Sequence, residues 1–341
     1  MTIHFAIVGC RHSHIGMFIN EMLALGHRCV GLYDPDDTSL AEQLAAKHGL
    51  PLMKDRDAFL DPALQVQVIG SASINCDKME LVEWAERHGI HVMFDKPAVT
   101  DREQLSRLEA VIRRGRIQVG MLLTERFRPA VYTLQQAIAA GQLGRLVSVS
   151  MRKPHRLNPA SRADWFFEKR RNGGVIVDLL IHDFDLLLWL TGQQAVSVQA
   201  VMTKNELPEY PDFWDAASAQ VIMNEGLIAQ LYADWHTPDK SWTWGDCRVF
   251  VNGTEGFAEL RLTGDPLVSD REELLLAVND RDPLHLAELA EPPCSLTEDF
   301  LRRIEGQPAV LTHEHILAAS ALTIDADEGA VLVNRFGVPE A

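Results

Sequence analysis

An apolar run in residues 173–192, GGVIVDLLIHDFDLLLWLTG, carries Asp178, His182 and Asp185 at helical spacing. Side chains three or four positions apart lie on one face of a helix, so these three point the same way. Burying an unpaired charge is costly, and such residues are usually paired with each other or placed where chemistry needs them. A carboxylate that orients an imidazole would form a general acid–base pair. A purely structural Asp–His hydrogen bond explains this segment equally well.

A second group of candidate residues follows the apolar run Ile3–Val8. The sequence GCRHSHIG, residues 9–16, keeps only the first glycine of the GxGxxG turn that binds dinucleotides, because Arg11 and His14 replace the other two. Free amides at a helix start still attract phosphate, and Arg11 would add positive charge. The residues predicted to bind a dinucleotide in this turn are Gly9, Arg11, His12, Ser13 and His14.

Asp34 ends the next β-like run, in GLYDPDD. An acid at this position accepts hydrogen bonds from the adenosine ribose and repels the extra phosphate of NADP, so we expect NAD as the cofactor, with NADP less favoured. The structural alternative is an ordinary turn aspartate before Pro35.

Two histidines one residue apart after a strand, as His12 and His14 are, can share a metal ion in hydrolase barrels. Such a barrel needs eight evenly repeated strand–helix units, and this chain lacks them. The sequence therefore predicts no metal site.

Lys96, in FDKP, follows the run His91–Phe94. An ammonium in a cleft can orient a hydroxyl and favour the loss of its proton. A lysine at a strand end is more often simply solvated, so Lys96 gains meaning only together with other candidates.

The first third of the chain alternates β-like and helical patterns, which predicts a doubly wound parallel sheet of the Rossmann type. Ligands of such sheets bind beyond the carboxyl ends of the strands, where Asp95 and Lys96 lie, and Ser71, Ser73 and Asn75 are cofactor candidates for the same reason. The expected strands are Ile3–Val8, Arg28–Tyr33, Val66–Gly70, His91–Phe94 and Ile117–Leu122, and the expected helices are Ile15–Leu25, Leu40–His48, Met79–His88 and Gln104–Arg114.

From Val147 onward β-rich runs follow one another, which predicts an α+β domain with a large open, mostly antiparallel sheet. We expect domains at 1–122 and 123–341, the second for substrate binding and oligomerisation. The hairpin turns expected in the second domain are Asn224-Glu225-Gly226 and Asn252-Gly253. Its expected helices are Ser295–Ile304 and Glu314–Val333, with Thr297 and Thr312 as expected N-caps.

Composition excludes several classes of partner. The net charge of −16 on 341 residues disfavours binding to nucleic acid or anionic lipid, and no apolar run suits a membrane span. The N-terminus lacks the basic segment of a signal peptide, and five scattered cysteines without a CxxC pair indicate reduced thiols. We expect a cytoplasmic protein that binds neither nucleic acid nor membranes.

In this order the motifs resemble the Gfo/Idh/MocA family of NAD(P)-dependent oxidoreductases. FDKP resembles the family's EKP motif, TERFRPA at Thr124–Ala130 its NxRFxP segment, residues 173–192 its GGxxxDxGxHxxDxxxxLxG helix, and Asn252–Gly256 a later match. Departures are Asp95 for glutamate, Thr124 for asparagine, and Ile74 and Lys78 in the segment that commonly reads TPNxxH.

The resemblance implies hydride transfer between NAD and a secondary alcohol or ketone of a polyol, cyclitol, sugar or sugar acid. It places the family's catalytic residues on Lys96, Asp178 and His182. His182 would remove the hydroxyl proton, Asp178 would orient the imidazole, and Lys96 would fix alcohol and cofactor. Arg126 would contact cofactor and substrate.

Two other functions stay open at this stage. Some relatives of this type carry out redox-neutral hydrolysis or elimination on a sugar with tightly held NAD. The altered glycine turn would also suit a noncatalytic NAD or ligand sensor.

A basic segment before the 173–192 helix contains further substrate candidates, Lys153, His155 and Trp165. Its charges could meet an anionic substrate, and Trp165 could face a sugar ring. The alternative is a solvated edge strand whose charges prevent aggregation. We also expect the open sheet face to be covered in a homodimer or homotetramer.

Overall fold

The computed structural model describes residues 2–337, which form two compact units. The first unit contains the described residues up to Leu122 together with Arg170–Gly173 and Ser295–Ser320. The second contains Leu123–Lys169, Gly174–Cys294 and the described residues from Ala321 onward. The expected domains 1–122 and 123–341 remain a prediction, and the units share their boundary after Leu122 while differing in the two short segments.

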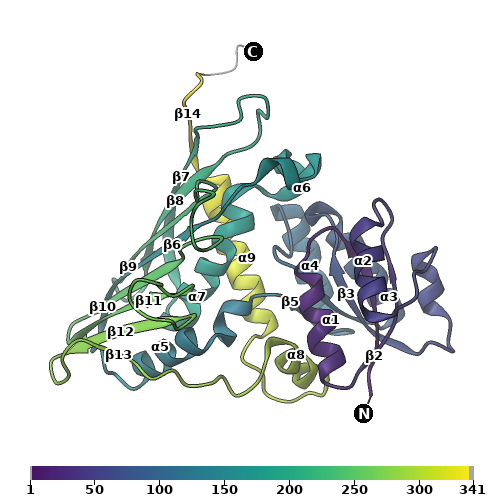
Figure 1. The fold of residues 1–341 in the computed structure, drawn as a ribbon, viewed down its shortest axis with the longest axis horizontal. Coiled ribbons are helices and arrows are strands. Elements are labelled where there is room, and N and C mark those ends of the chain that lie inside the picture. Colours follow the sequence, from purple (N-terminus) through teal and green to yellow (C-terminus); the bar gives the residue numbers. More distant parts are fainter. Residues whose placement is uncertain (1, 338–341) are drawn as a thin grey trace. The chain divides into compact units, whose positions relative to one another are not determined.

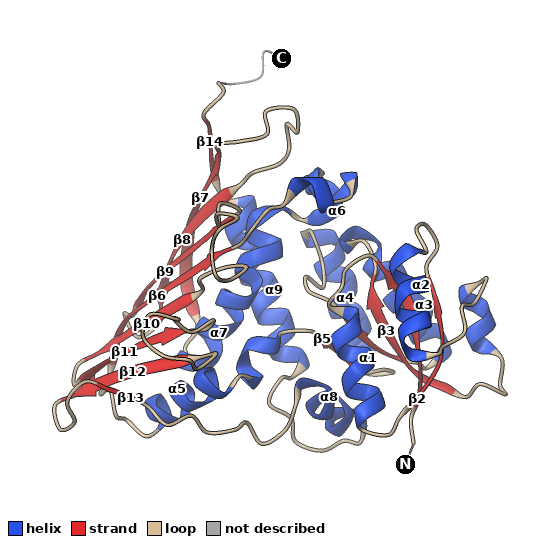
Figure 2. Cartoon of the chain, in the orientation of Figure 1, coloured by secondary structure: helices blue, strands red, loops and turns tan. Residues whose placement is uncertain are grey.

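The first unit is built on a parallel five-stranded sheet in the order β2-β1-β3-β4-β5, with helices on both faces (Figure 1, Figure 2). This order confirms the doubly wound Rossmann-type sheet. Its strands are β1 His4–Cys10, β2 Arg28–Tyr33, β3 Val66–Ala72, β4 His91–Phe94 and β5 Val119–Met121, and its connecting helices are α1 Ile15–Ala24, α2 Ser39–His48, α3 Lys78–His88 and α4 Arg102–Arg114.

Residue types explain these boundaries. Residues Phe5 to Cys10 of β1 are buried without alternation, as in a sheet covered on both faces. Helices α2, α3 and α4 each end at a glycine in the left-handed conformation, where a side chain would be strained. Short 3₁₀ segments occur at Arg56–Leu60 and Asn75–Asp77.

The edge strand β5 is closed by the late segment Ser295–Ser320. His313 accepts a hydrogen bond from Val119 N at 3.0 Å, and Arg303 donates to Val119 O at 2.8 Å. These side chains satisfy backbone groups that a free edge would leave open to another chain. Helix α8, Leu296–Ile304, begins with a capping box of Ser295 and Glu298, so the expected cap at Thr297 is wrong by two residues.

The second unit contains a nine-stranded sheet in the order β13-β12-β11-β10-β6-β9-β8-β7-β14, which confirms the large, mostly antiparallel sheet (Figure 1). Only the pairs β6–β9 and β7–β14 are parallel. Its strands are β6 Leu146–Pro154, β7 Ala195–Lys204, β8 Ala216–Met223, β9 Ile228–Asp234, β10 Arg248–Gly253, β11 Gly256–Arg261, β12 Leu274–Asn279, β13 His285–Leu286 and β14 Val331–Asn334.

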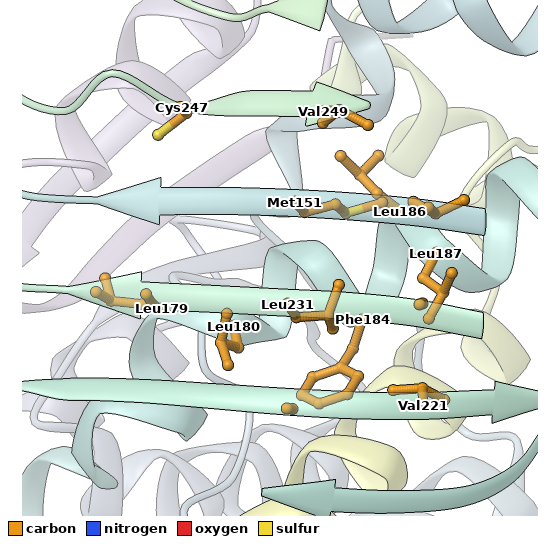
Figure 3. Close-up of a cluster of buried hydrophobic side chains, with 14 of the residues drawn as sticks. Met151, Leu179, Leu180, Phe184, Leu186, Leu187, Val221, Leu231, Cys247 and Val249 are labelled. Carbon is orange, nitrogen blue, oxygen red and sulfur yellow. The ribbon is translucent and has the colours of Figure 1, made fainter. Parts of the chain in front are cut away.

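Helices α5 and α7 cover one face of this sheet, and side chains from α7 lie beside those of β6, β8, β9 and β10 (Figure 3). Phe184 is fully buried there, which stabilises the unit by roughly 1.5–3 kcal/mol. The helical segments of this unit are α5 Pro129–Ala139, α7 Ile181–Thr191, 3₁₀ turns at Thr124–Phe127, Pro159–Ser161 and Asp164–Phe167, and a π-helical turn at Ile176–Leu180. Helix α6, Lys169–Asn172, belongs to the first unit from Arg170 onward, and helix α9, His313–Glu328, belongs to the first unit up to Ser320 and to the second from Ala321.

Several expectations for this unit need correction. The helix expected over Glu314–Val333 ends at Glu328, because Val331–Asn334 forms a strand beside β7. The basic segment is not an edge strand, since β6 lies between β10 and β9. The β10–β11 turn has Thr254 and Glu255 at its tip rather than Asn252-Gly253, whereas the turn at Gly226 lies between β8 and β9 as expected.

The opposite face of the sheet carries no helix in the part of the chain that the structure describes. Side chains of β8 and β9 alternate between buried and exposed, and Val147, Val196 and Ile222 are among the exposed apolar ones. Coverage of this face by a second copy stays a prediction.

Among residues 2–337, no helix is long and apolar enough to cross a membrane. All five cysteines are free thiols and four of them are buried, as the cysteine pattern predicts.

Candidate active site

Loops at the carboxyl ends of four strands of the first unit carry its candidate residues. Gly9 has φ +84°, and a Cβ there would lie 2.0 Å from Ser73 Oγ. Ser73 Oγ also donates a hydrogen bond to Val8 O at 3.4 Å, so the end of β1 and the residues after β3 are closely packed. A glycine is therefore required at position 9.

The amides of the altered glycine turn offer an anion site. Helix α1 follows directly, and its first residues receive no side-chain cap. The backbone N–H groups of His12 and Ser13 meet no acceptor within residues 2–337. Such amides at a helix start bind phosphate, so replacing two glycines leaves the donors of a dinucleotide site in place.

Asp34 is buried and holds two loops together. Its Oδ2 accepts from Cys10 N at 2.6 Å, and its Oδ1 accepts from Asp36 N and Asp37 N at 3.0 and 3.1 Å. Arg11 lies between carboxylates, 3.8 Å from Asp34 and 3.6 Å from Asp37. Asp34 is thus a turn aspartate as well as the candidate acid for the ribose, and its role toward a ribose stays a prediction.

His12, His14 and Asp95 form a cluster that joins the loops after β1 and β4. Asp95 Oδ2 lies 3.2 Å from His12 Nδ1, and Asp95 Oδ1 lies 3.0 Å from His14 Nδ1. Burial raises the pKa of Asp95, but His14 and His12 offset that effect and hold it well below its ordinary value. Asp95 is therefore a buried, ionised carboxylate.

Lys96 is buried, and its backbone is fixed by Lys78, which enters from the start of α3. Lys78 Nζ donates to Asp95 O at 2.6 Å, to Pro97 O at 2.8 Å and to Asn75 Oδ1 at 2.8 Å. Asn75 in turn donates to Asn172 O at 2.7 Å. These contacts position Lys96 from both sides. Sequence reasoning noted Lys78 only as a departure from a motif; its position three residues after Asn75 was the available signal.

In the second unit, Asp178 lies in the π-helical turn Ile176–Leu180, and His182 lies in the first turn of α7. Single π turns within helices are frequent at functional sites. The expected continuous α-helix is therefore interrupted at Asp178, which is buried, while His182 is half-buried. A direct Asp178–His182 pair stays a prediction.

Asp185 and Arg126 form a buried ion pair in the same unit. Arg126 donates to Asp185 Oδ2 at 2.8 Å and to Oδ1 at 2.5 Å, and its guanidinium lies over the Trp189 ring. This bidentate contact gives Asp185 a structural role in the second unit. The ion pair also gives Arg126 a structural role that the sequence did not predict. Contacts of Arg126 with cofactor and substrate stay predictions.

Lys153 is buried between two carboxylates, 2.7 Å from Glu125 and 3.8 Å from Asp183. Burial raises the pKa of Glu125, but Lys153 and the nearby His182 more than offset this and lower it to about 2. Burial raises the pKa of Asp183 to about 7, because the single ammonium is shared and Glu125 is closer. Sequence reasoning found Lys153 but not its partners, which come from distant segments.

The other substrate candidates lie in an aromatic cluster. His155 contacts the Trp235 ring edge at 5.7 Å, and Trp165 is buried beside Phe166. Arg162 lies 4.1 Å from the Phe166 ring centre, and burial lowers its pKa although Asp178 is near enough to oppose that shift. Contacts of His155 and Trp165 with a substrate stay predictions.

Two family models match consecutive parts of the chain. A model described as the oxidoreductase family, NAD-binding Rossmann fold of GFO/IDH/MocA matches residues 3–121. A model of the GFO/IDH/MocA C-terminal domain matches residues 131–259.

Curated proteins and solved structures agree with these matches. The chain is 29% identical over 275 residues to a myo-inositol dehydrogenase of Streptomyces leeuwenhoekii, covering 76% of this chain and 77% of that protein. It is 27% identical over 221 residues to a UDP-N-acetylglucosamine 3-dehydrogenase of Acidithiobacillus ferrooxidans, covering 65% and 64%. A solved structure from Erwinia carotovora atroseptica has a TM-score of 0.87 at 26% identity, covering 97% of this chain and all of that one.

Replacing Lys78 by methionine should loosen the backbone around Lys96. The change leaves the carbonyls of Asp95 and Pro97 without their buried donor, at about 1–3 kcal/mol for each acceptor. We expect a lower free energy of unfolding and faster hydrogen–deuterium exchange in residues 93–99. The exposed Lys47 gives a matched control, Lys47→Met, which should change neither. Unaltered exchange in Lys78→Met would show that Lys78 does not fix this loop.

Replacing Asp183 by asparagine should remove a loss of folding stability that grows as the pH rises. The pKa of Asp183 is raised from its ordinary value of 3.8 to about 7 in the folded protein, so between these two pH values the native state holds a proton that the unfolded chain has released. Its contribution to stability is therefore greatest at low pH and is lost as the pH rises through about 7. Urea unfolding between pH 5 and 8 should show Asp183→Asn gaining stability relative to the parent protein as pH rises. Parallel curves would contradict the raised pKa.

Proposed function

Because the chain belongs to the Gfo/Idh/MocA family of oxidoreductases, we propose that it transfers hydride between NAD and a secondary alcohol or ketone. The substrate class is a polyol, cyclitol, sugar or sugar acid. The observation that carries this assignment is a half-buried histidine, His182, one turn after the buried Asp178 in a π-interrupted apolar helix. The names of the inositol and amino-sugar dehydrogenases among the relatives support the same substrate class.

Residues of the first unit fit a dinucleotide. The open amides of His12 and Ser13 would bind its pyrophosphate, and the tight contact of Gly9 with Ser73 keeps the turn compact. Asp34 keeps lone pairs for a ribose hydroxyl, because a carboxylate can accept about four hydrogen bonds and three backbone donors occupy it. When bound, the nicotinamide supplies the hydride acceptor.

His182 acts as the general base that takes the hydroxyl proton during oxidation and returns it during reduction. Asp178 stabilises the imidazolium that forms and orients the ring. Lys96 donates a hydrogen bond to the substrate oxygen, which favours the alkoxide character that develops as hydride leaves. The Lys78 contacts hold the Lys96 backbone still while this happens.

The acidic turn after β2 supports NAD rather than NADP. A 2′-phosphate near Asp34 would also meet Asp37, and these two carboxylates already offset the charge of Arg11. Calorimetric titration should give NAD⁺ an affinity at least about tenfold above that of NADP⁺, equivalent to about 1.4 kcal/mol. The variant Asp37→Ser should narrow this preference, and the neighbouring Asp36→Ser should not. Tighter binding of NADP⁺ by the parent protein would reverse the cofactor assignment.

Replacing His182 by alanine should lower kcat by about 10²–10⁴-fold, the usual contribution of a general base. The measurement is NADH formation during a screen of polyols, cyclitols, sugars and sugar acids, with NAD⁺ affinity measured separately and expected to be unchanged. His285→Ala, which removes an exposed histidine, is the control and should retain full turnover.

The same screen separates the other functions. Full turnover by His182→Ala would remove His182 from the mechanism. Product without net NADH would indicate redox-neutral chemistry instead, and NAD⁺ binding without turnover of any substrate would indicate a sensor.

A further inference from the structure

The cluster of His12, His14 and Asp95 has the composition of a metal site. One suitable ligand atom from each residue lies within 4.8 Å of the others. The two imidazole rings meet edge to face with centroids 4.0 Å apart, and each directs its Nδ1 to a different oxygen of Asp95. Three groups that can ligate a metal ion therefore lie close together.

Two of the three ligand-to-ligand distances in the cluster are close to those of a zinc site. Zinc binds imidazole nitrogen and carboxylate oxygen at about 2.0–2.2 Å, so neighbouring ligands of a tetrahedral site lie roughly 3.3–3.5 Å apart. The two N–O distances in the cluster are 3.2 and 3.0 Å. Opening each of these two distances by a few tenths of an ångström, with the two Nδ1 atoms brought to a similar separation from each other, would admit the ion. The histidine side chains are 35% and 41% exposed, which leaves them room to move.

The fold supplies the third ligand, which sequence reasoning did not consider. His12 and His14 follow β1, whereas Asp95 follows β4, 81 residues beyond His14. Parallel strands bring their carboxyl ends to one edge of the sheet, where all three residues lie. The sequence predicts no metal site because it lacks the eight strand–helix repeats of a hydrolase barrel. That argument does not apply to a site formed at the edge of this sheet.

Local charges both favour and oppose a cation. The Asp95 carboxylate is buried, and a cation would compensate its negative charge. The Lys96 ammonium repels a cation, so three protein ligands should hold it less tightly than a closed four-ligand zinc site.

We propose that His12, His14 and Asp95 bind one divalent transition-metal ion, with Zn²⁺ the best match to two imidazoles and a carboxylate. Coordination runs through both Nδ1 atoms and the Asp95 carboxylate. At least one position then stays open for water or another ligand. This site goes beyond the proposed hydride transfer, in which no step uses a metal ion.

The proposed metal site is tested by calorimetric titration with Zn²⁺. The protein is native, free of any tag and treated with chelator, and no nucleotide is present. We expect saturation at one ion per chain. Titration with Co²⁺ should give the visible absorption of a four-coordinate site. Absence of saturable binding would overturn the inference.

Variants locate the site. His12→Ala, His14→Ala and Asp95→Asn should each weaken Zn²⁺ binding by about 100-fold or more, since loss of even an outer-shell partner costs 10–100-fold. His285→Ala is the matched control and should bind like the parent protein. Thermal unfolding of each variant without Zn²⁺ checks that it folds. Added Zn²⁺ should raise the melting temperature of the parent protein but not that of a folded His12→Ala variant.

Undiminished Zn²⁺ affinity in these three variants would place the ion elsewhere and overturn the assignment. Because nucleotide is absent from the measurement, failure to bind NAD⁺ would count against the proposed function and leave the metal result unaffected.

Discussion

A charge buried in a protein must be compensated where it lies, and both units of this chain are organised around that requirement. In the first unit, the Lys78 ammonium is surrounded by carbonyl oxygens, and this arrangement fixes the loop that presents Lys96. In the second, Arg126 and Asp185 neutralise each other, whereas Lys153 is divided between two carboxylates. Compensation is incomplete at Asp183, where burial raises the pKa of the carboxyl to about 7.

The proposed catalytic residues belong to this pattern. His182 directly precedes Asp183 and lies close enough to Glu125 to lower its pKa. The imidazole is therefore connected electrostatically to a buried network, and a change in its protonation will be felt there. A π-helical turn in the same segment places Asp178 where a regular α-helix would not. Such backbone irregularities persist only when surrounding packing holds them, and the apolar residues of this turn, Ile176, Val177, Leu179 and Leu180, are all buried.

Patterns that depend on neighbouring residues were predictable from the sequence. The strand–helix alternation of the first 122 residues matched the observed elements to within a few residues, because buried parallel strands and glycine-terminated helices have strong local signals. The last helix was expected to continue to Val333, since the apolar residues Ala330, Val331 and Leu332 suit a helix as well as a strand. Its end is decided by pairing with β7, a contact between segments about 130 residues apart that no local pattern reports.

In the candidate site, too, local patterns were predictable from the sequence and contacts between distant segments were not. Gly9, Asp34 and Lys96 follow strands and could be placed at a sheet edge from the sequence. Their partners could not, because Lys78, Glu125 and Asp95 become partners only through the fold. The interpretation of β6 as a solvated edge strand is wrong for the same reason, since the neighbours β10 and β9 and the pairing of Lys153 with Glu125 are all long-range contacts.

The two units are interleaved along the chain. The first relies on Ser295–Ser320 to close its β5 edge, and the second relies on Val331–Asn334 to extend its sheet beyond β7. During synthesis, the first unit must therefore wait with an open sheet edge until nearly all of the second has left the ribosome. A protease cut between residues 122 and 123 would not release two complete halves, and a fragment ending at residue 122 would expose the backbone of Val119 to other chains.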